Sequence, residues 1–270
     1  MPEIVLAIGV ALLALTAVML AGWFLQARLG NAGWSDVFWT FGTGLAASLC
    51  AIIPLDSFEA PITRRVLTAG LCAAWSVRLG LHIALRVRHS PEDARYRAMR
   101  EEQGERFQRD LLGFMLVQGP VGAVLALSVL IAAHVPRALG VFDAAAVLIF
   151  AGAVAGEALA DAQLTRFKAD PANRGQVCDV GLWAWSRHPN YVFEWLMWMA
   201  YPTAALGFGL ARPWFWTSLV APVVMYLLLT RVSGVPPLER AMLASRGQLY
   251  RDYQSRVPAF FPFSRSGAST

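Results

Sequence analysis

Residues 4–27 read IVLAIGVALLALTAVMLAGWFLQA and contain no charged side chain. A bilayer core about 30 Å thick is crossed by roughly 20 helical residues, because each residue adds about 1.5 Å. The run therefore predicts a transmembrane helix. It has no basic segment before it and no convincing small-residue cleavage site, so we interpret it as a retained first helix and not as a secretory signal.

Further apolar runs of similar length follow along the chain. With the first run they predict seven spans, at about 4–27, 34–53, 66–85, 111–133, 139–160, 191–210 and 214–231. The composition agrees, because 57% of the residues are hydrophobic, only 15% are charged, and the mean hydropathy is +0.48. Such values are not those of a soluble chain. We predict an all-α integral membrane protein with seven transmembrane helices, forming a single domain over residues 1–270.

The distribution of Lys and Arg indicates how the helices are oriented, since cytoplasmic loops carry an excess of both residues. The first, third and fifth connections and the C-terminal tail hold 18 of the 23 Lys and Arg residues. This asymmetry predicts an N-terminus outside and a C-terminus in the cytoplasm. The formal net charge of +5 does not indicate nucleic acid as a partner, because the basic residues are divided among loops. The predicted partner is the lipid bilayer.

The remaining composition excludes other classes of site. Cys50, Cys72 and Cys178 are scattered, and no clustered His and Cys spacing accompanies them. Neither a disulfide framework nor a metal site is therefore predicted. The third connection, about 86–110, alternates acidic and basic residues after Ser90-Pro91 and predicts a solvated cytoplasmic helix. The fifth, about 161–190, is rich in turn residues and predicts a functional loop or lid.

Ionisable side chains also occur inside the predicted spans, where each costs about 2.5–3.5 kcal/mol near the bilayer centre. They are Asp36, Arg78, His82, Glu157, Asp161 and Glu194. With the orientation above, all of them fall in the cytoplasmic half of the membrane. We therefore predict a polar cavity that opens to the cytoplasm.

The spacing of these residues adds geometry, because residues four apart share a helix face. Arg78 and His82 form one such pair, and Asn190 and Glu194 form another. Glu157 and Asp161 form a third, in which two acids repel unless a cation, a shared proton or a hydrogen-bonding ligand lies between them. The alternative is that these pairs only cross-link helices.

The richest polar and aromatic segment is GLWAWSRHPNYVFEWLMW, residues 181–198. No GxGxxG, GxxxxGK[ST], HExxH or GxSxG motif occurs. Arg187, His188, Asn190 and Tyr191 could hold a phosphate or a carboxamide at the start of a helix. The tryptophans are typical of an interfacial belt. The tail places Tyr250 and Tyr253 on one face, and it could lie on anionic lipid or cap a bound nucleotide.

Blocks along nearly the whole chain carry a resemblance to a known family. They are DVFWTFG (Asp36 to Gly42), AWSVRLGLHI (ending at Ile83), EDARY (Glu92 to Tyr96), GEALADAQLTRFK (Gly156 to Lys168), GLWAWSRHPNYVFE (Gly181 to Glu194) and the tail pattern ER…LYRDY…VPAFFPF. Together they resemble the membrane steroid 5-alpha-reductase family in its bacterial branch. The RHPNY…E block also resembles isoprenylcysteine carboxyl methyltransferases and sterol reductases.

The resemblance implies a seven-helix fold in the bacterial inner (plasma) membrane, with NADPH held on the cytoplasmic side. It implies a cofactor-binding half at about 139–265 and no metal. The predicted cofactor-binding residues come from this resemblance and from segment 181–198. They are Glu157, Asp161, Lys168, Arg187, His188, Asn190, Tyr191, Glu194, Arg231, Glu239, Tyr253 and Arg256. Aligning the tail requires a gap, which weakens the transfer of roles to Arg231 and Glu239. Asp36 takes the place of a catalytic Glu, and the family's substrate-orienting Tyr is replaced near Trp75.

The activity that the resemblance implies is reduction of the carbon–carbon double bond of a 3-oxo-4-ene steroid or similar enone lipid. Asp36, if protonated, could donate a hydrogen bond to the developing enolate, with Arg78 or His82 tuning it. If Asp36 is instead ionised by Arg78, the donor must be a tyrosine or water. The alternatives are a membrane methyltransferase that uses S-adenosylmethionine and a non-enzymatic lipid or sterol binder.

Overall fold

The computed structural model of the protein describes residues 2–262. These residues form helices, turns and loops, and no β-strand occurs among them. The all-α prediction is therefore confirmed. Arg265, which the orientation argument counts in the tail, and the last residues of the predicted cofactor-binding half lie outside the described residues. The chain divides into two compact units. Unit 1 is Met1–Val147 with Ala200–Val224, and unit 2 is Leu148–Met199 with Met225–Thr270.

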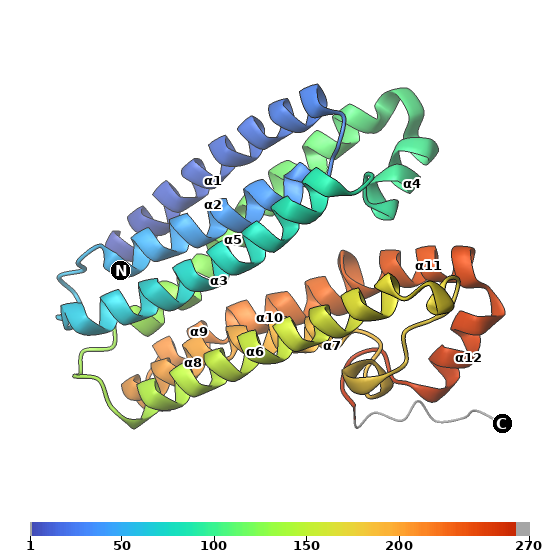
Figure 1. The fold of residues 1–270 in the computed structure, drawn as a ribbon. Helices are drawn as coiled ribbons and strands as arrows, with labels where there is room; N and C mark the ends of the chain where they lie inside the picture. Colours follow the sequence, from blue (N-terminus) through green and yellow to red (C-terminus); the bar gives the residue numbers. More distant parts are fainter. Residues whose placement is uncertain (1, 263–270) are drawn as a thin grey trace. The chain divides into compact units, whose positions relative to one another are not determined.

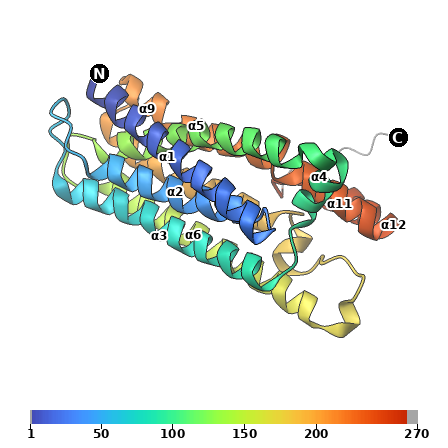
Figure 2. The same cartoon turned by 90° about the horizontal axis from the view of Figure 1, so that it is seen from above.

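The long helices of unit 1 are α1 (Pro2–Leu29), α2 (Trp34–Ile52), α3 (Ile62–His89) and α5 (Phe107–Ala133), and they lie side by side (Figures 1 and 2). The central helix is α2, which contacts the other long helices of the unit. Small residues permit this approach, because a Cβ on Gly44 would lie 2.0 Å from the Cβ of Ser76. In lipid, such close backbone packing is a main source of helix association.

The shorter elements of unit 1 are α4 (Ala94–Gln103), η1 (Gly104–Arg106), α8 (Ala200–Ala205), η4 (Leu206–Phe208) and α9 (Pro213–Ser218). The helix predicted after Ser90-Pro91 is confirmed as α4. Its start is set by Asp93, whose side chain accepts a hydrogen bond from the backbone N–H of Arg95 at 3.0 Å. Both α8 and α9 pack against α5.

Unit 2 contains α6 (Val141–Ala169) from Leu148 onward, η2 (Pro171–Asn173), η3 (Gly181–Ala184), α7 (Pro189–Trp198), the π-helical turn η5 (Leu228–Val232), α11 (Val235–Arg246) and α12 (Gln248–Arg256). The helix α10 (Val220–Leu227) is shared between the units. Gly156 on α6 allows α7 to come close, because a Cβ there would lie 2.3 Å from the Phe193 ring. Tyr250 and Tyr253 of α12 pack against Met242 and Leu243 of α11.

Within residues 2–262, six helical stretches are long and apolar enough to cross a membrane. They are Pro2–Leu29, Trp34–Ile52, Ile62–His89, Arg95–Ala133, Val141–Ala169 and Pro213–Arg246. The outer faces are also apolar, since Val5, Leu6 and Leu13 of α1 are each about 70% exposed. Large apolar surfaces of this kind are stable only in lipid or against a partner. The fold is that of a multi-pass membrane protein.

The structure differs from the sequence prediction at segment 191–210, which is not one continuous helix. Here α7 ends at Trp198 and α8 begins at Ala200. Pro202 provides the reason, because proline lacks an N–H and its ring clashes with the carbonyl four residues earlier, at Trp198. In the same way, the ring of Pro222 clashes with the carbonyl position of Ser218, where α9 ends. In the other direction, α6 extends past the predicted end at residue 160 to Ala169.

Candidate functional site

The loop that enters α7 carries several of the predicted binding residues of unit 2. Pro189 is the first residue of α7, and its fixed φ angle suits that position. His188 precedes it at the N-cap, but no side chain caps the helix. The first backbone N–H groups of α7 are therefore left without a side-chain acceptor, which gives this helix end a positive character.

Arg187 is bound to protein through every nitrogen of its side chain. Its Nε and Nη2 donate to the two carboxylate oxygens of Glu239 at 2.6 and 3.1 Å. Its Nη1 donates to the backbone carbonyls of Gln254 at 3.2 Å and Val257 at 2.5 Å. Paired and mostly buried charges of this kind hold distant segments together. Arg187 thus ties the α7 loop to α11 and to the end of α12.

Glu239 collects further donors, and we call the group of Arg187, His188, Glu239 and Gln254 the Arg187 clamp. The Nε2 atoms of His188 and Gln254 lie 3.1 and 2.8 Å from its carboxylate. Because a carboxylate only accepts, His188 must carry its proton on Nε2. The His188 ring is buried and stacks on Tyr191, with ring centroids 5.4 Å apart. The structure therefore brings together Arg187, His188, Tyr191 and Glu239.

The tail folds back over the same loop. Tyr253 Oη donates to the backbone carbonyl of Trp183 at 2.5 Å. The backbone N–H of Arg187 donates to the backbone carbonyl of Pro258 at 2.9 Å. Burial raises the pKa of Tyr250 and Tyr253, so both phenols stay protonated at neutral pH. Tyr250 and Tyr253 are each 2% exposed, so this face of α12 packs on protein.

Asn190 has a different status from the residues of the clamp. Its side chain is half-buried and makes no hydrogen bond with any residue in the described part of the chain. One turn further along α7, Glu194 is buried and accepts a hydrogen bond from the indole of Trp198 at 3.1 Å. Glu157 is also buried, on the turn of α6 that meets α7 through Gly156. A polar amide and two carboxylates are thus carried by neighbouring turns of α6 and α7.

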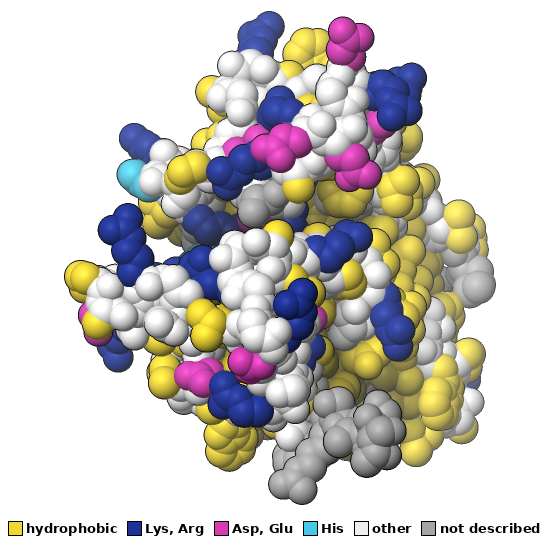
Figure 3. All heavy atoms as spheres, turned by 90° about the vertical axis from the view of Figure 1, so that its right-hand side faces the viewer, with side chains coloured by type: hydrophobic (Ala, Val, Ile, Leu, Met, Phe, Trp, Pro, Cys, Tyr) yellow, Lys and Arg dark blue, Asp and Glu magenta, His cyan; other side chains and the backbone are white. Residues whose placement is uncertain are grey.

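The cations of unit 2 are mostly at its surface. Lys168 on α6, Arg231 in η5 and Arg256 on α12 are exposed. Arg256 pairs with Asp179 at 3.2 Å. Figure 3 looks at the end of the molecule that carries α12, and it shows Lys and Arg side chains exposed there. These side chains are accessible to an anionic ligand, in contrast to Arg187. Asp161 lies part-buried on α6.

Unit 1 carries the candidate catalytic residue Asp36, in the first turn of α2. Its carboxylate accepts hydrogen bonds from Tyr96 Oη at 2.8 Å and from Arg95 Nη2 at 3.0 Å. Arg95 also donates to Asp93 through Nε at 3.1 Å. The ion pair of Asp36 is with Arg95 of α4, and not with Arg78, which was one of the alternatives that the sequence left open. Asp36 accepts both hydrogen bonds in this cluster.

The other candidates in unit 1 lie on α3. Trp75 is 1% exposed, Arg78 is part-buried one turn further on, and His82 is exposed. Sequence reasoning missed the roles of Arg95 and Tyr96 beside Asp36, although both belong to the EDARY block. It also missed Gln254, for which the sequence holds no signal.

An all-helical chain with several membrane-crossing helices and a polar site at the start of α7 defines a polytopic membrane protein. The chain belongs to the family described as "Protein of unknown function (DUF1295)", which matches residues 22–257. It is 26% identical over 287 residues to an uncharacterized protein of Schizosaccharomyces pombe, covering 92% of this chain and 80% of the relative. No solved structure matches the chain significantly.

Proposed function

We propose that the protein is an NADPH-dependent reductase that saturates the carbon–carbon double bond of a 3-oxo-4-ene steroid or a similar enone lipid. The family to which the chain belongs is associated with steroid 5-alpha-reductase-like proteins. The sequence blocks from Asp36 to the tail support the same assignment. The proposal includes a seventh span at 191–210, a bacterial inner membrane location and a cofactor site facing the cytoplasm.

The observation that carries the proposal is the start of α7. Asn190 offers both amide donors and an acceptor with no protein partner, beside a helix end without a side-chain cap. These groups match a carboxamide or a pyrophosphate, which a helix N-terminus favours. The Arg187 clamp fixes the loop that presents them. We assign Asn190, Tyr191 and Glu194 to the cofactor, with Glu157 and Asp161 of α6.

The 2′-phosphate that distinguishes NADPH from NADH calls for Arg or Lys. Arg187 does not fit this role, because Glu239 and two backbone carbonyls occupy its donors. The exposed side chains of Lys168, Arg231 and Arg256 fit it better. We therefore assign Arg187, His188, Glu239 and Tyr253 to positioning the site. The phosphate contact is assigned to the exposed cations.

Bound NADPH would supply a hydride to the β carbon of the enone. Negative charge then develops on the carbonyl oxygen, which a positioned hydrogen-bond donor stabilises. Asp36 accepts hydrogen bonds from Arg95 and Tyr96. The hydroxyl proton of this cluster belongs to Tyr96. Because Tyr96 already donates that proton to Asp36, we propose that Arg95 and Tyr96 position the Asp36 carboxylate and that water or a tyrosine outside this cluster donates to the carbonyl oxygen.

The test is NADPH binding and oxidation by the detergent-purified protein, with and without progesterone or testosterone. Steroid-dependent oxidation and a product heavier by two hydrogens are expected. Methyl transfer from S-adenosylmethionine without nicotinamide binding would replace the reductase with the methyltransferase. Sterol binding with neither cofactor would leave only a lipid binder.

A pair of variants tests the assignment of the site. Asn190→Ala should weaken NADPH binding at least tenfold, because it removes an amide that no protein group replaces, while the thermal unfolding midpoint stays unchanged. Gln176→Ala is the matched control, since this exposed amide lies in unit 2 in the loop after η2 and is not part of α7. Equal NADPH affinity in both variants would remove Asn190 from the site.

A further inference from the structure

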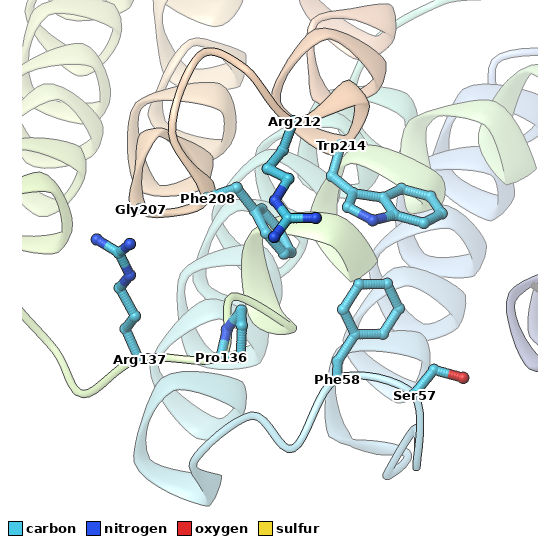
Figure 4. A pocket seen from close by; sticks show the side chains of 8 residues that line it. All are labelled: Ser57, Phe58, Pro136, Arg137, Gly207, Phe208, Arg212 and Trp214. Carbon is cyan, nitrogen blue, oxygen red and sulfur yellow. The ribbon is translucent and has the colours of Figure 1, made fainter.

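A cavity of about 270 Å³ in unit 1 has no role in the proposed reaction. It is formed where the loop after α2, the loop after α5 and the segment between η4 and α9 meet (Figure 4). Its walls include Phe58, Phe208, Trp214, Arg137 and Arg212. Aromatic rings and arginines together are the usual lining for a ligand with an anionic group and an apolar part.

The aromatic side of the cavity is a packed cluster. The Phe58 ring centroid lies 5.9 Å from that of Phe208 and 5.2 Å from that of Trp214, both edge-to-face. Phe58 is buried, while Phe208 and Trp214 are half-buried. The rings thus form a firm apolar wall that stays partly open to a ligand.

The charged side of the cavity has no counter-charge. Arg137 and Arg212 are both exposed, and neither guanidinium makes an ion pair or hydrogen bond with residues 2–262. No carboxylate is among the residues that line the cavity. Figure 4 shows the Arg212 guanidinium beside the Phe208 and Trp214 rings, and the Arg137 side chain extending toward Gly207 at the other side of the cavity. Two unpaired cations beside one apolar wall favour an anion with an attached hydrocarbon.

A third arginine fixes this rim. Arg64 of α3 is 2% exposed, and it donates through Nε to the carbonyl of Arg137 at 3.2 Å and through Nη2 to that of Ala138 at 3.1 Å. Both of its terminal nitrogens also bind the Asp143 carboxylate. We call Arg64 and Asp143 the Arg64 lock. Because the lock holds the backbone at Arg137, this loop does not need to be ordered when a ligand binds.

The location of the cavity indicates what would reach it. The apolar helix α2 ends at Ile52 and α5 ends at Ala133, while α3 begins at Ile62 and α9 at Pro213. The cavity therefore lies where membrane-crossing helices end, which is the level of lipid headgroups. Close by, Trp216 is 60% exposed and its indole donates to the carbonyl of Leu210. An exposed tryptophan of this kind is typical of the bilayer interface.

We propose that this cavity binds the phosphate-bearing headgroup of an anionic phospholipid. Arg137 and Arg212 would contact the phosphate, and the Phe58, Phe208 and Trp214 rings would contact the adjoining carbon atoms. A cavity of about 270 Å³ is large enough for a headgroup but not for whole acyl chains, which would lie along the apolar helices outside. The proposal does not depend on the reductase assignment.

The test measures lipid retention by native mass spectrometry of the full chain in neutral detergent, titrated with phosphatidylglycerol or phosphatidylcholine. The double variant Arg137→Ala/Arg212→Ala should bind phosphatidylglycerol at least about tenfold more weakly than the unaltered protein. Each Arg near an anionic lipid surface contributes about 1 kcal/mol of electrostatic attraction, and the variant lacks two of them. The double variant Arg88→Ala/Arg106→Ala removes two exposed cations elsewhere in unit 1 and should bind like the unaltered protein. Arg137→Lys/Arg212→Lys should retain most of the binding.

Several results would overturn the proposal. Equal binding of the two lipids would exclude an anionic headgroup site, and equal weakening in both alanine variants would indicate only a general charge effect. Inorganic phosphate forms a separate arm. Arginine-dependent binding of free phosphate with no preference for phosphatidylglycerol would assign the cavity to a soluble anion. If the alanine variant has an unchanged thermal unfolding midpoint, misfolding is excluded as the cause of weaker lipid binding. If its midpoint falls, the Arg137→Lys/Arg212→Lys variant tests the role of the same two charges.

Discussion

The Arg64 lock of unit 1 and the Arg187 clamp of unit 2 use an arginine in the same way but have different surroundings. In both, every side-chain nitrogen is bound to a carboxylate or to backbone carbonyls. Among residues 2–262, Asp143 otherwise accepts only from the backbone N–H of Gly140, whereas Glu239 also accepts from His188 and Gln254.

The comparison teaches where a ligand would bind. Each of these arginines uses four of its five N–H donors on protein groups, so it holds segments together and has little left to offer a ligand. The available groups lie next to each arginine: Arg137 beside the lock, and Asn190 beside the clamp. Saturated ion pairs therefore mark the scaffold, and the unsatisfied polar groups that they position mark the candidate sites.

The largest expected effect comes from breaking the lock. Arg64→Met leaves the Asp143 carboxylate buried without its cation, which costs about 3–5 kcal/mol. The thermal unfolding midpoint in detergent should fall sharply. The double variant Arg64→Met/Asp143→Leu should recover most of this loss, because it buries no charge. If the double variant is as unstable as the single one, the lock acts through the loop carbonyls and not through the ion pair.

Breaking the clamp should cost less. Arg187→Met leaves Glu239 with hydrogen bonds from His188 and Gln254, so a loss of about 1–3 kcal/mol is expected. Amide hydrogen exchange should rise over residues 248–257, and NADPH and NADH should weaken by the same factor. Arg251→Met, an exposed cation on α12, is the control. A loss confined to NADPH would instead make Arg187 a phosphate ligand.

Acid should loosen a weaker contact of unit 1, between Glu92 and its donors. Burial alone would raise the pKa of Glu92, but hydrogen bonds from Arg100 and the Ala32 N–H outweigh it and hold this pKa below its usual value. A lowered pKa contributes stability that is present above the unfolded value, about 4.3, and is lost as the pH falls through the folded value. Hydrogen exchange in α4 should therefore rise below about pH 4. In Glu92→Gln this acid-induced rise should disappear.

The smallest effect on stability is expected at Arg256. Its pair with Asp179 is exposed, so Arg256→Gln should change the unfolding free energy by about 0–1 kcal/mol. If Arg256 holds the 2′-phosphate, the variant should weaken NADPH much more than NADH. Arg240→Gln, an exposed cation on α11, should leave the ratio of the two affinities unchanged. An equal change in both cofactors would contradict the assignment.

Much of the fold could be predicted because its signal is local. The runs at 4–27, 34–53 and 111–133 became α1, α2 and α5 to within a few residues. Segment 191–210 is divided into shorter helices because hydropathy counts Pro202 as an ordinary residue, whereas its ring interrupts the helix at Trp198. In the site, the blocks that resemble the family pointed to Arg187, His188 and Glu239. They did not show that Arg187 and His188 both bind the Glu239 carboxylate.

The sequence by itself determined the class of protein and the position of most helices. A membrane span is recognised from the length of a single apolar run compared with the thickness of the bilayer, so the signal lies within one segment of the chain. Tertiary structure alone decided the partner of each charged group. Asp36 finds Arg95 and Arg187 finds Glu239 across 59 and 52 residues of sequence, respectively. A hydrogen bond depends on a few ångströms in space, so spacing along the chain cannot reveal which polar groups are already satisfied.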